Sequence, residues 1–270
     1  VYRMKGFQFP ISSRTAKGTP IINFLPLQNG EKVEAILPYN PEEEAKSLLF
    51  VTRNGIVKRT LMSEFKNINR TGKVAISLNE GDTLAFVRRT TGDEEILIAG
   101  DRGNAVRFKE SAVRLMGRTA TGVRGIDLMG GKVVGVASSS MGETVMSLTE
   151  KGYGKRSLIS DYRLTDRGTR GVKTIVTSEE TGPIVAFRAV SGDEDALIVT
   201  ETGQMIRFHL QNVKIQGRTT RGVRVIRLAE GDKVLRLALT DHEESTTNDD
   251  LIENTEIDTD TIEEIIDDQE

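Results

Sequence analysis

A repeat of about 50 residues is the feature that most limits what this chain can fold into. In each full copy a glycine is followed four positions later by an arginine, and successive arginines lie 48, 49 and 51 residues apart. Repeats of this length indicate a propeller-like or solenoid array, in which each module packs against its neighbours. The pairs are Gly55 with Arg59, Gly103 with Arg107, Gly152 with Arg156, and Gly203 with Arg207.

The start of the chain holds a partial copy. A second glycine follows 15 residues after most of these arginines, and counting back 15 from Gly18 reaches Arg3. A chain that begins at Val1 inside an apolar segment is typical of a fragment of a larger polypeptide. We therefore expect one domain over residues 1–240 and a tail over 241–270. The expected modules are 1–47, 48–95, 96–144, 145–196 and 197–240.

Each module has the pattern of β-structure. Apolar runs flank a turn at Asn54-Gly55, and the same shape recurs around the glycine of the other repeats; such pairs between β-rich runs are hairpin signals. Further turn signals raise the expected count to about four strands per module, the unit of a propeller blade. No part of 1–240 shows sustained helical periodicity. The sequence predicts an all-β array of about five four-stranded blades, the first incomplete.

The charges are strongly segregated. The formal net charge is −3, but 14 of the 40 acidic residues lie in 241–270, which contains no Lys or Arg. Residues 1–240 therefore carry +11 and the tail −14. This asymmetry indicates a polyanionic partner and a polyanion mimic in the same chain. We expect the tail to be disordered; the alternative is a docking helix with Ile262, Ile265 and Ile266 on one face.

Several functional classes are excluded by composition. The chain has no cysteine and only two histidines, and His242 falls in the tail, so a histidine-ligated metal centre would depend on His209 alone. We expect no metal site and no catalytic residue, because no paired carboxylates converge on a site. No apolar run approaches the ~18–20 residues needed to cross a bilayer, and there is no signal peptide, so we expect no membrane association.

The basic residues recur at fixed offsets, which favours a phosphate-binding surface. A short loop ending in the second glycine carries Arg or Lys in every module, and blade symmetry would arrange these loops as a positive belt around the outside. The candidate DNA-binding residues are Arg14, Lys17, Lys58, Arg59, Arg70, Lys73, Arg107, Arg118, Arg124, Lys155, Arg156, Arg167, Arg170, Lys173, Arg207, Arg218, Arg221 and Arg224.

Structural interpretations of the same residues remain open. Turn geometry alone would explain the repeated glycines, and a salt bridge between blades would explain the repeated arginines. Aromatic residues are 5% of the chain, with no Trp, which argues against base stacking, and no recognition helix is present. Contact with the DNA backbone plus DNA deformation is therefore the expected mode. An alternative is a protein-interaction propeller whose basic rim binds an acidic partner.

Four segments resemble the C-terminal domain of the bacterial DNA gyrase A subunit: SRTAKGTPIINFLPL, RTGKVAISL, RFKESAVRLMGRTATGVRGI and KGYGKRSLISDY. The resemblance covers residues 1 to about 240. It implies a β-pinwheel that wraps duplex DNA around its basic perimeter and so serves negative supercoiling by an ATP-dependent type II topoisomerase. The family has six modules where this chain shows five, and its heptapeptide, which distinguishes gyrase from topoisomerase IV, is absent here. The equivalent domain of topoisomerase IV is thus an alternative.

The same resemblance implies the wider context. The expected partners are the N-terminal cleavage domain of gyrase A and the gyrase B subunit in a heterotetramer, in the bacterial cytoplasm at the nucleoid. ATP and Mg are expected on other parts of that enzyme, and no cofactor on this chain. The tyrosines lie in blade segments and are not the DNA-cleaving residue; they are Tyr2, Tyr39, Tyr153 and Tyr162.

Overall fold

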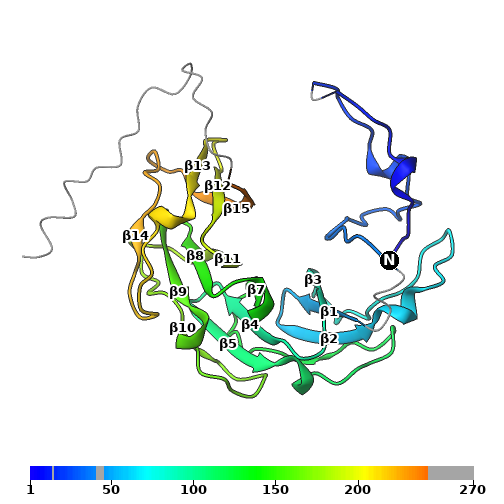
Figure 1. The fold of residues 1–270 in the computed structure, drawn as a ribbon, viewed down its shortest axis with the longest axis horizontal. Helices are drawn as coiled ribbons and strands as arrows, with labels where there is room; N and C mark the ends of the chain where they lie inside the picture. Colours follow the sequence, from blue (N-terminus) through cyan, green and yellow to red (C-terminus); the bar gives the residue numbers. More distant parts are fainter. Residues whose placement is uncertain (14, 41–45, 243–270) are drawn as a thin grey trace, which may run out of the picture.

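The computed structural model describes residues 1–13, 15–40 and 46–242, and these residues form four antiparallel sheets around an open arc (Figure 1). Three sheets have four strands, in the orders β3-β1-β2-β6, β10-β5-β4-β7 and β11-β8-β9-β14, and the last has three, β13-β12-β15. The strands are β1 (Ser47–Thr52), β2 (Ile56–Leu61), β3 (Leu84–Thr90), β4 (Glu95–Gly100), β5 (Asn104–Lys109), β6 (Val123–Arg124), β7 (Val133–Ser138), β8 (Thr144–Thr149), β9 (Tyr153–Leu158), β10 (Val172–Lys173), β11 (Ile184–Val190), β12 (Glu194–Thr200), β13 (Met205–His209), β14 (Val223–Arg224) and β15 (Val234–Asp241).

The prediction of an all-β, propeller-like array is confirmed. Short 3-10 turns are the only helical elements in the described residues, and none is long and apolar enough to cross a membrane. They are η1 (Gly6–Gln8), η2 (Ile21–Asn23), η4 (Met62–Phe65), η5 (Glu110–Ala112), η6 (Ser139–Met141), η7 (Ile159–Asp161) and η8 (Leu210–Asn212).

A hairpin forms the centre of each four-stranded sheet, and in the three-stranded sheet β15 borders the hairpin of β12 and β13. The first glycine of each repeat occupies the hairpin turn at positive φ, as at Gly55 with φ of 85°, where L-residues are strained. The register then places the repeated arginine opposite an apolar residue of the partner strand, for example Arg59 opposite Leu49. One edge strand of each sheet lies on the inner side of the arc (Figure 1); these strands are β3, β7, β11 and β15.

The outer strand of each four-stranded sheet comes from the following repeat. Val123 of β6 pairs with Val57 of β2, and β10 and β14 pair in the same way with β5 and β9. The expectation of four strands per blade therefore holds for three sheets, but the fourth strand is exchanged between modules. The last sheet has three strands because no further repeat follows it in the described residues.

The first repeat contributes no sheet. Residues 1–40 contain η1 and η2 but no strand in their described part, so the structure shows four sheets where we expected about five blades. The described part of this copy forms no hairpin of its own. Val1 nevertheless pairs with Lys73 of the following repeat, as the exchanged strands do elsewhere. The Val1 amine donates to the Lys73 carbonyl at 2.8 Å, and the Lys73 N–H donates to the Val1 carbonyl at 2.9 Å.

The hydrophobic core lies between successive blades. Leu49 and Val57 of one repeat pack with Ile96, Ile98 and Phe108 of the next in one buried cluster. All six residues of β1 are buried because both faces of the hairpin meet neighbouring structure. Blade-to-blade packing thus stabilises the arc and fixes the direction in which the outer loops face. The next cluster repeats the arrangement with Leu97, Ala105, Val145, Tyr162 and Phe187.

Candidate nucleic-acid interface

The outer side of the arc is formed by three equivalent loops, which we call the rim loops: residues 114–124, 163–173 and 214–224 (Figure 1). Each starts after a 3-10 turn that closes a hairpin and ends in the short exchanged strand β6, β10 or β14. Because that strand is bonded to the preceding sheet, each loop is held at both ends. Equivalent residues therefore return to equivalent places along the rim.

The glycine that precedes each exchanged strand is required by close approach. A Cβ on Gly122, Gly171 or Gly222 would lie 2.6, 2.0 or 2.6 Å from a backbone carbonyl oxygen of the preceding repeat, and all three have positive φ. No side chain fits there without moving the backbone. The structural interpretation of these glycines is therefore supported, although they also give the rim loops their shape.

The repeated arginines connect one blade to the next. Arg107 Nη1 donates to the Tyr162 carbonyl at 2.8 Å, and Arg156 Nε donates to the Val213 carbonyl at 2.7 Å. Arg59 Nη1 lies 3.4 Å from Glu110 Oε1 in the next repeat, and its side chain is 11% exposed. These contacts match the inter-blade alternative. We therefore assign Arg59, Arg107 and Arg156 to blade packing and remove them from the DNA-binding set.

Arg207 differs because no blade follows it in the described residues. Its Nε donates to Asp195 Oδ2 of the same sheet at 2.7 Å, and its side chain is 41% exposed. At the other end of the array, Arg3 keeps the inter-blade contact by donating to the Lys66 carbonyl at 3.0 Å. The same arginine position is thus buried or half-buried at Arg59, Arg107 and Arg156 and exposed at both ends of the described array.

Lys58 and Lys155 lie in the interior, contrary to their predicted role. Both are 0% exposed. Lys58 Nζ donates to the carbonyls of Ala75 and Arg118, and Lys155 Nζ donates to the Gly217 carbonyl and to Thr220 Oγ1. They hold the rim loop of the next repeat from beneath and cannot reach a phosphate.

The buried charge of Lys155 predicts a pH-dependent stability. Burial, together with the charge of Arg218, lowers the pKa of Lys155 from 10.5 to about 8. Below pH 8 the folded state holds a buried charge, and this cost is relieved between pH 8 and 10.5, where only the unfolded lysine still binds the proton. The unfolding free energy of the wild type minus that of Lys155→Met should rise across this window by on the order of 3 kcal/mol. Urea denaturation at several pH values measures it, with the exposed Lys132→Met as control; a flat difference would contradict the assignment.

The fifth residue of each rim loop is an arginine that braces the preceding loop. Arg118 donates to the Val74 carbonyl at 3.3 Å, Arg167 to the Arg124 carbonyl at 3.1 Å, and Arg218 to the Lys173 carbonyl at 2.8 Å. These half-buried guanidinium groups therefore fix the spacing of successive loops. They add positive charge to the rim, but their hydrogen bonds to carbonyl groups leave them only partly available to bind a phosphate.

The other predicted rim residues are solvent-facing. Arg170 and Arg221 are 70% and 60% exposed and pair with Asp127 at 3.4 Å and Glu180 at 3.1 Å. Exposed pairs of this kind contribute ~0–1 kcal/mol, so a phosphate can replace the carboxylate. Arg14 lies outside the described residues, as does the acidic segment 243–270. The remaining members are the exposed Lys17, Arg70, Arg124, Lys173 and Arg224 and the half-buried Lys73.

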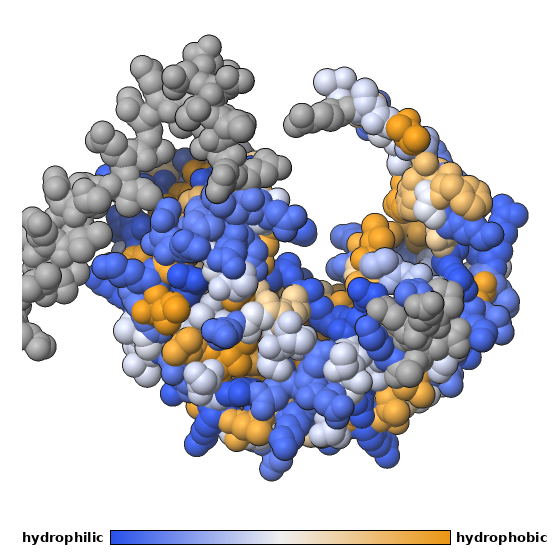
Figure 2. All heavy atoms as spheres, in the orientation of Figure 1, coloured by the Kyte–Doolittle hydropathy of each residue, from blue (hydrophilic) through white to orange (hydrophobic). Residues whose placement is uncertain are grey.

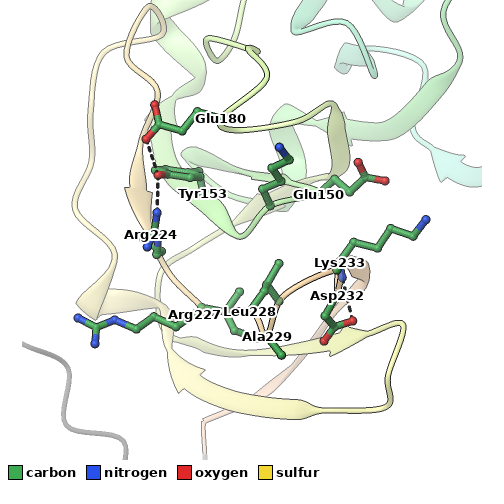
Figure 3. Close-up of a pocket in the computed structure, with 12 residues that line it drawn as sticks. Glu150, Tyr153, Glu180, Arg224, Arg227, Leu228, Ala229, Asp232 and Lys233 are labelled. Atoms are coloured by element: carbon green, nitrogen blue, oxygen red, sulfur yellow. Dashed lines mark hydrogen bonds between the residues drawn. The ribbon is translucent and has the colours of Figure 1, made fainter.

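The rim of the last described loop is ordered around Tyr153 (Figure 3). The Tyr153 hydroxyl donates to Glu180 Oε1 at 2.7 Å and accepts from Arg224 Nη2 at 2.8 Å. The guanidinium of Arg224 also lies 5.2 Å from the ring centroid. The Tyr153 hydrogen bond and then the charge of Arg221 lower the pKa of Glu180. This network holds Arg224 at the mouth of an open groove that Lys151 and Lys233 also line.

One repeated basic position is missing from the predicted set. The residue seven after the repeated arginine is basic in four repeats and exposed in each, just after the 3-10 turn. This recurrence is visible in the sequence, but the predicted set of DNA-binding residues does not include the position. Figure 2 shows the outer margin as mainly hydrophilic with scattered apolar patches. The residues are Lys66, Arg114, Arg163 and Lys214.

These features define a propeller-like repeat domain with exchanged outer strands and a basic rim. The family described as "DNA gyrase C-terminal domain, beta-propeller" matches residues 1–40, 46–91, 94–140, 143–191 and 194–241. The chain therefore belongs to the family of DNA gyrase C-terminal domains.

Relatives and solved structures agree with this family. The DNA gyrase A subunit of Ureaplasma parvum serovar 3 is 43% identical over 240 residues, covering 88% of this chain and 28% of the relative. Its counterpart in Staphylococcus aureus (strain NCTC 8325 / PS 47) is 43% identical over 255 residues, covering 93% and 29%. The chain thus spans less than a third of these relatives.

Two solved structures share the fold. The C-terminal domain of DNA topoisomerase IV superposes with a TM-score of 0.77 at 25% identity, covering 83% of this chain and 71% of that one. A DNA gyrase A C-terminal domain gives 0.73 at 26% identity, covering 85% and 77%.

Proposed function

We propose that this chain binds duplex DNA through its rim loops without sequence preference and bends the DNA along the arc. The observation that carries the proposal is the exposed basic residue that ends each exchanged strand: Arg124, Lys173 and Arg224. One cation per blade at an equivalent position would contact phosphates at several places along a duplex. Backbone contacts of this type supply affinity without reading bases.

A duplex that binds along the curved rim must bend, and this bending is what we call wrapping. Bending 20–30 bp by 40–90° costs of order 1–6 kcal/mol, so several spaced contacts must offset it. The rim supplies them from successive blades, and the half-buried Arg118, Arg167 and Arg218 keep the loops in place. Rigid spacing favours the bent duplex because the cations need not be reorganised on binding.

Within a complete gyrase, we propose that this wrapping serves ATP-dependent negative supercoiling. The catalytic chemistry, ATP and Mg would then belong to other parts of the enzyme, among them the N-terminal cleavage domain of gyrase A, together with the gyrase B subunit. The names and identities of the relatives support a gyrase context. The TM-score to the topoisomerase IV domain keeps that enzyme as a second candidate.

A topology experiment tests the wrapping. Nicked plasmid is ligated in the presence of increasing amounts of the chain, the protein is removed, and the linking-number distribution is read on a gel. Wrapping is expected to shift the distribution in proportion to bound protein. A mobility shift without any change in linking number would show binding without wrapping. Absence of both, together with capture of an acidic protein partner, would favour the protein-interaction alternative.

A further inference from the structure

The two histidines of the chain meet at one carboxylate in the terminal sheet. His209 Nδ1 lies 3.1 Å and His242 Nδ1 lies 2.7 Å from the same oxygen, Oδ1 of Asp195. Their ring centroids are 4.0 Å apart. From the sequence, any histidine site was expected to depend on His209 alone, because His242 was placed in the tail. That expectation is wrong, since β15 carries His242 back to the blade.

Three adjacent strands create this cluster. Asp195 on β12 is directly opposite His209 on β13 and opposite Thr240 on β15, two residues before His242. Strand positions of this kind are held more rigidly than loop positions. Arg207 donates to the other oxygen of Asp195 at 2.7 Å, as Arg107 donates to Glu95 at the equivalent positions of an inner sheet.

We infer that Asp195, His209 and His242 form a binding site for a divalent transition-metal ion of the zinc class. Two imidazoles and a carboxylate are ligands that Zn²⁺ uses, with a fourth position left to water. Bonds of ~2.0–2.1 Å in a tetrahedron separate ligand atoms by about 3.3 Å. The ligand atoms here lie within 4.8 Å of one another, so small side-chain rotations suffice.

The surroundings of Asp195 suit a metal ligand. The guanidinium of Arg207 donates to Asp195 Oδ2 at 2.7 Å and stabilises the charged form of the carboxylate. The carboxylate is therefore ionised at neutral pH. Its second oxygen is occupied by Arg207, the kind of outer partner that orients a ligating carboxylate. Such nitrogen-rich sites select Zn²⁺, Cu²⁺, Ni²⁺ or Co²⁺ over Mg²⁺ and Ca²⁺.

A bound ion would have a structural consequence. His242 directly precedes the acidic segment 243–270. Coordination would tie the end of β15 to β13, the edge strand of a sheet that lacks a fourth strand. The ion would thus stabilise the terminal blade by binding the folded state alone.

Co²⁺ and Zn²⁺ binding to the whole chain tests the site. With excess Mg²⁺ present to occupy the carboxylates of the acidic segment, one Co²⁺ per chain should give visible d–d absorption, and Zn²⁺ should displace it. His242→Gln should weaken Zn²⁺ binding by about 100-fold, and His209→Gln with His242→Gln should abolish it. Zn²⁺ should raise the melting temperature of the wild type but not of the double variant.

The controls separate the cluster from general acidity. Glu230→Gln, which removes an exposed carboxylate from the turn before β15, should bind Zn²⁺ like the wild type. His242 directly follows β15 and has a 39% exposed side chain, so its replacement should leave the fold intact, as circular dichroism will show. The inference is overturned if the double variant binds Zn²⁺ with wild-type affinity. It is also overturned if the wild type does not bind Zn²⁺ when Mg²⁺ is present.

Discussion

Replacing Arg124 and Arg224 by alanine is expected to lower the affinity for duplex DNA by about 10- to 100-fold at moderate salt. Each neutralised phosphate contributes about 0.9 to the slope of log affinity against log salt, so the slope should fall by about 1.8. Both side chains are exposed and end equivalent exchanged strands, β6 and β14. Fluorescence anisotropy with unrelated 40-bp duplexes over a salt series measures the change.

The loss should be equal for all sequences, because these residues are proposed to contact phosphates. The matched control is Arg89→Ala with Arg236→Ala, which removes two exposed arginines from β3 and β15 on the inner side of the arc (Figure 1). The control pair should keep most of the affinity. Equal losses in the two double variants would place the DNA elsewhere or indicate a nonspecific charge effect.

Gly171→Ala is expected to lower the unfolding free energy by about 3 kcal/mol or more, the range of severe backbone clashes. Gly171 has φ of 69°, and an added Cβ would lie 2.0 Å from the Ala105 carbonyl oxygen. That carbonyl belongs to the residue paired with Val172, so the clash strikes the exchanged strand itself. The added methyl group should therefore disrupt the strand pairing that joins two modules. Urea denaturation followed by circular dichroism measures the loss.

Gly203→Ala provides the control for backbone strain alone. Gly203 has φ of 88°, and no atom lies within 4 Å of its added Cβ. Its replacement should cost about 1 kcal/mol, the strain of a left-handed residue. Similar losses in the two variants would show that the close approach of the repeats contributes little.

The sequence predicted the repeat and its β-character well, since both depend on local patterns. The glycine turns at Gly55 and its equivalents and the apolar runs around them are short-range signals. The exchanged strands were not predictable in this way. Val123 and Arg124 read locally as the end of a loop, and only their pairing with β2 makes them part of the previous sheet.

The candidate site was predicted in part. The rim loops were located correctly as the outer, exposed basic segments, but Lys58, Lys155 and the repeated arginines were grouped with them. Adjacent residues of one strand face opposite ways, so Lys155 and Arg156 could not both have faced a phosphate on the outer rim. The hydrogen-bond partners of Lys155 and Arg156 lie between 57 and 65 positions later in the sequence. No local pattern reveals partners at that separation.

The sequence by itself determined the repeat, the all-β class and the separation of a positive body from an acidic end, because periodicity and charge are properties of the chain. Only the tertiary structure decided which cations face solvent and which connect blades, because burial depends on contacts with residues far along the chain. The histidines show the same division. Their residue types were plain in the sequence, but antiparallel pairing of β12 with β13 and β15 was needed to bring them to one carboxylate.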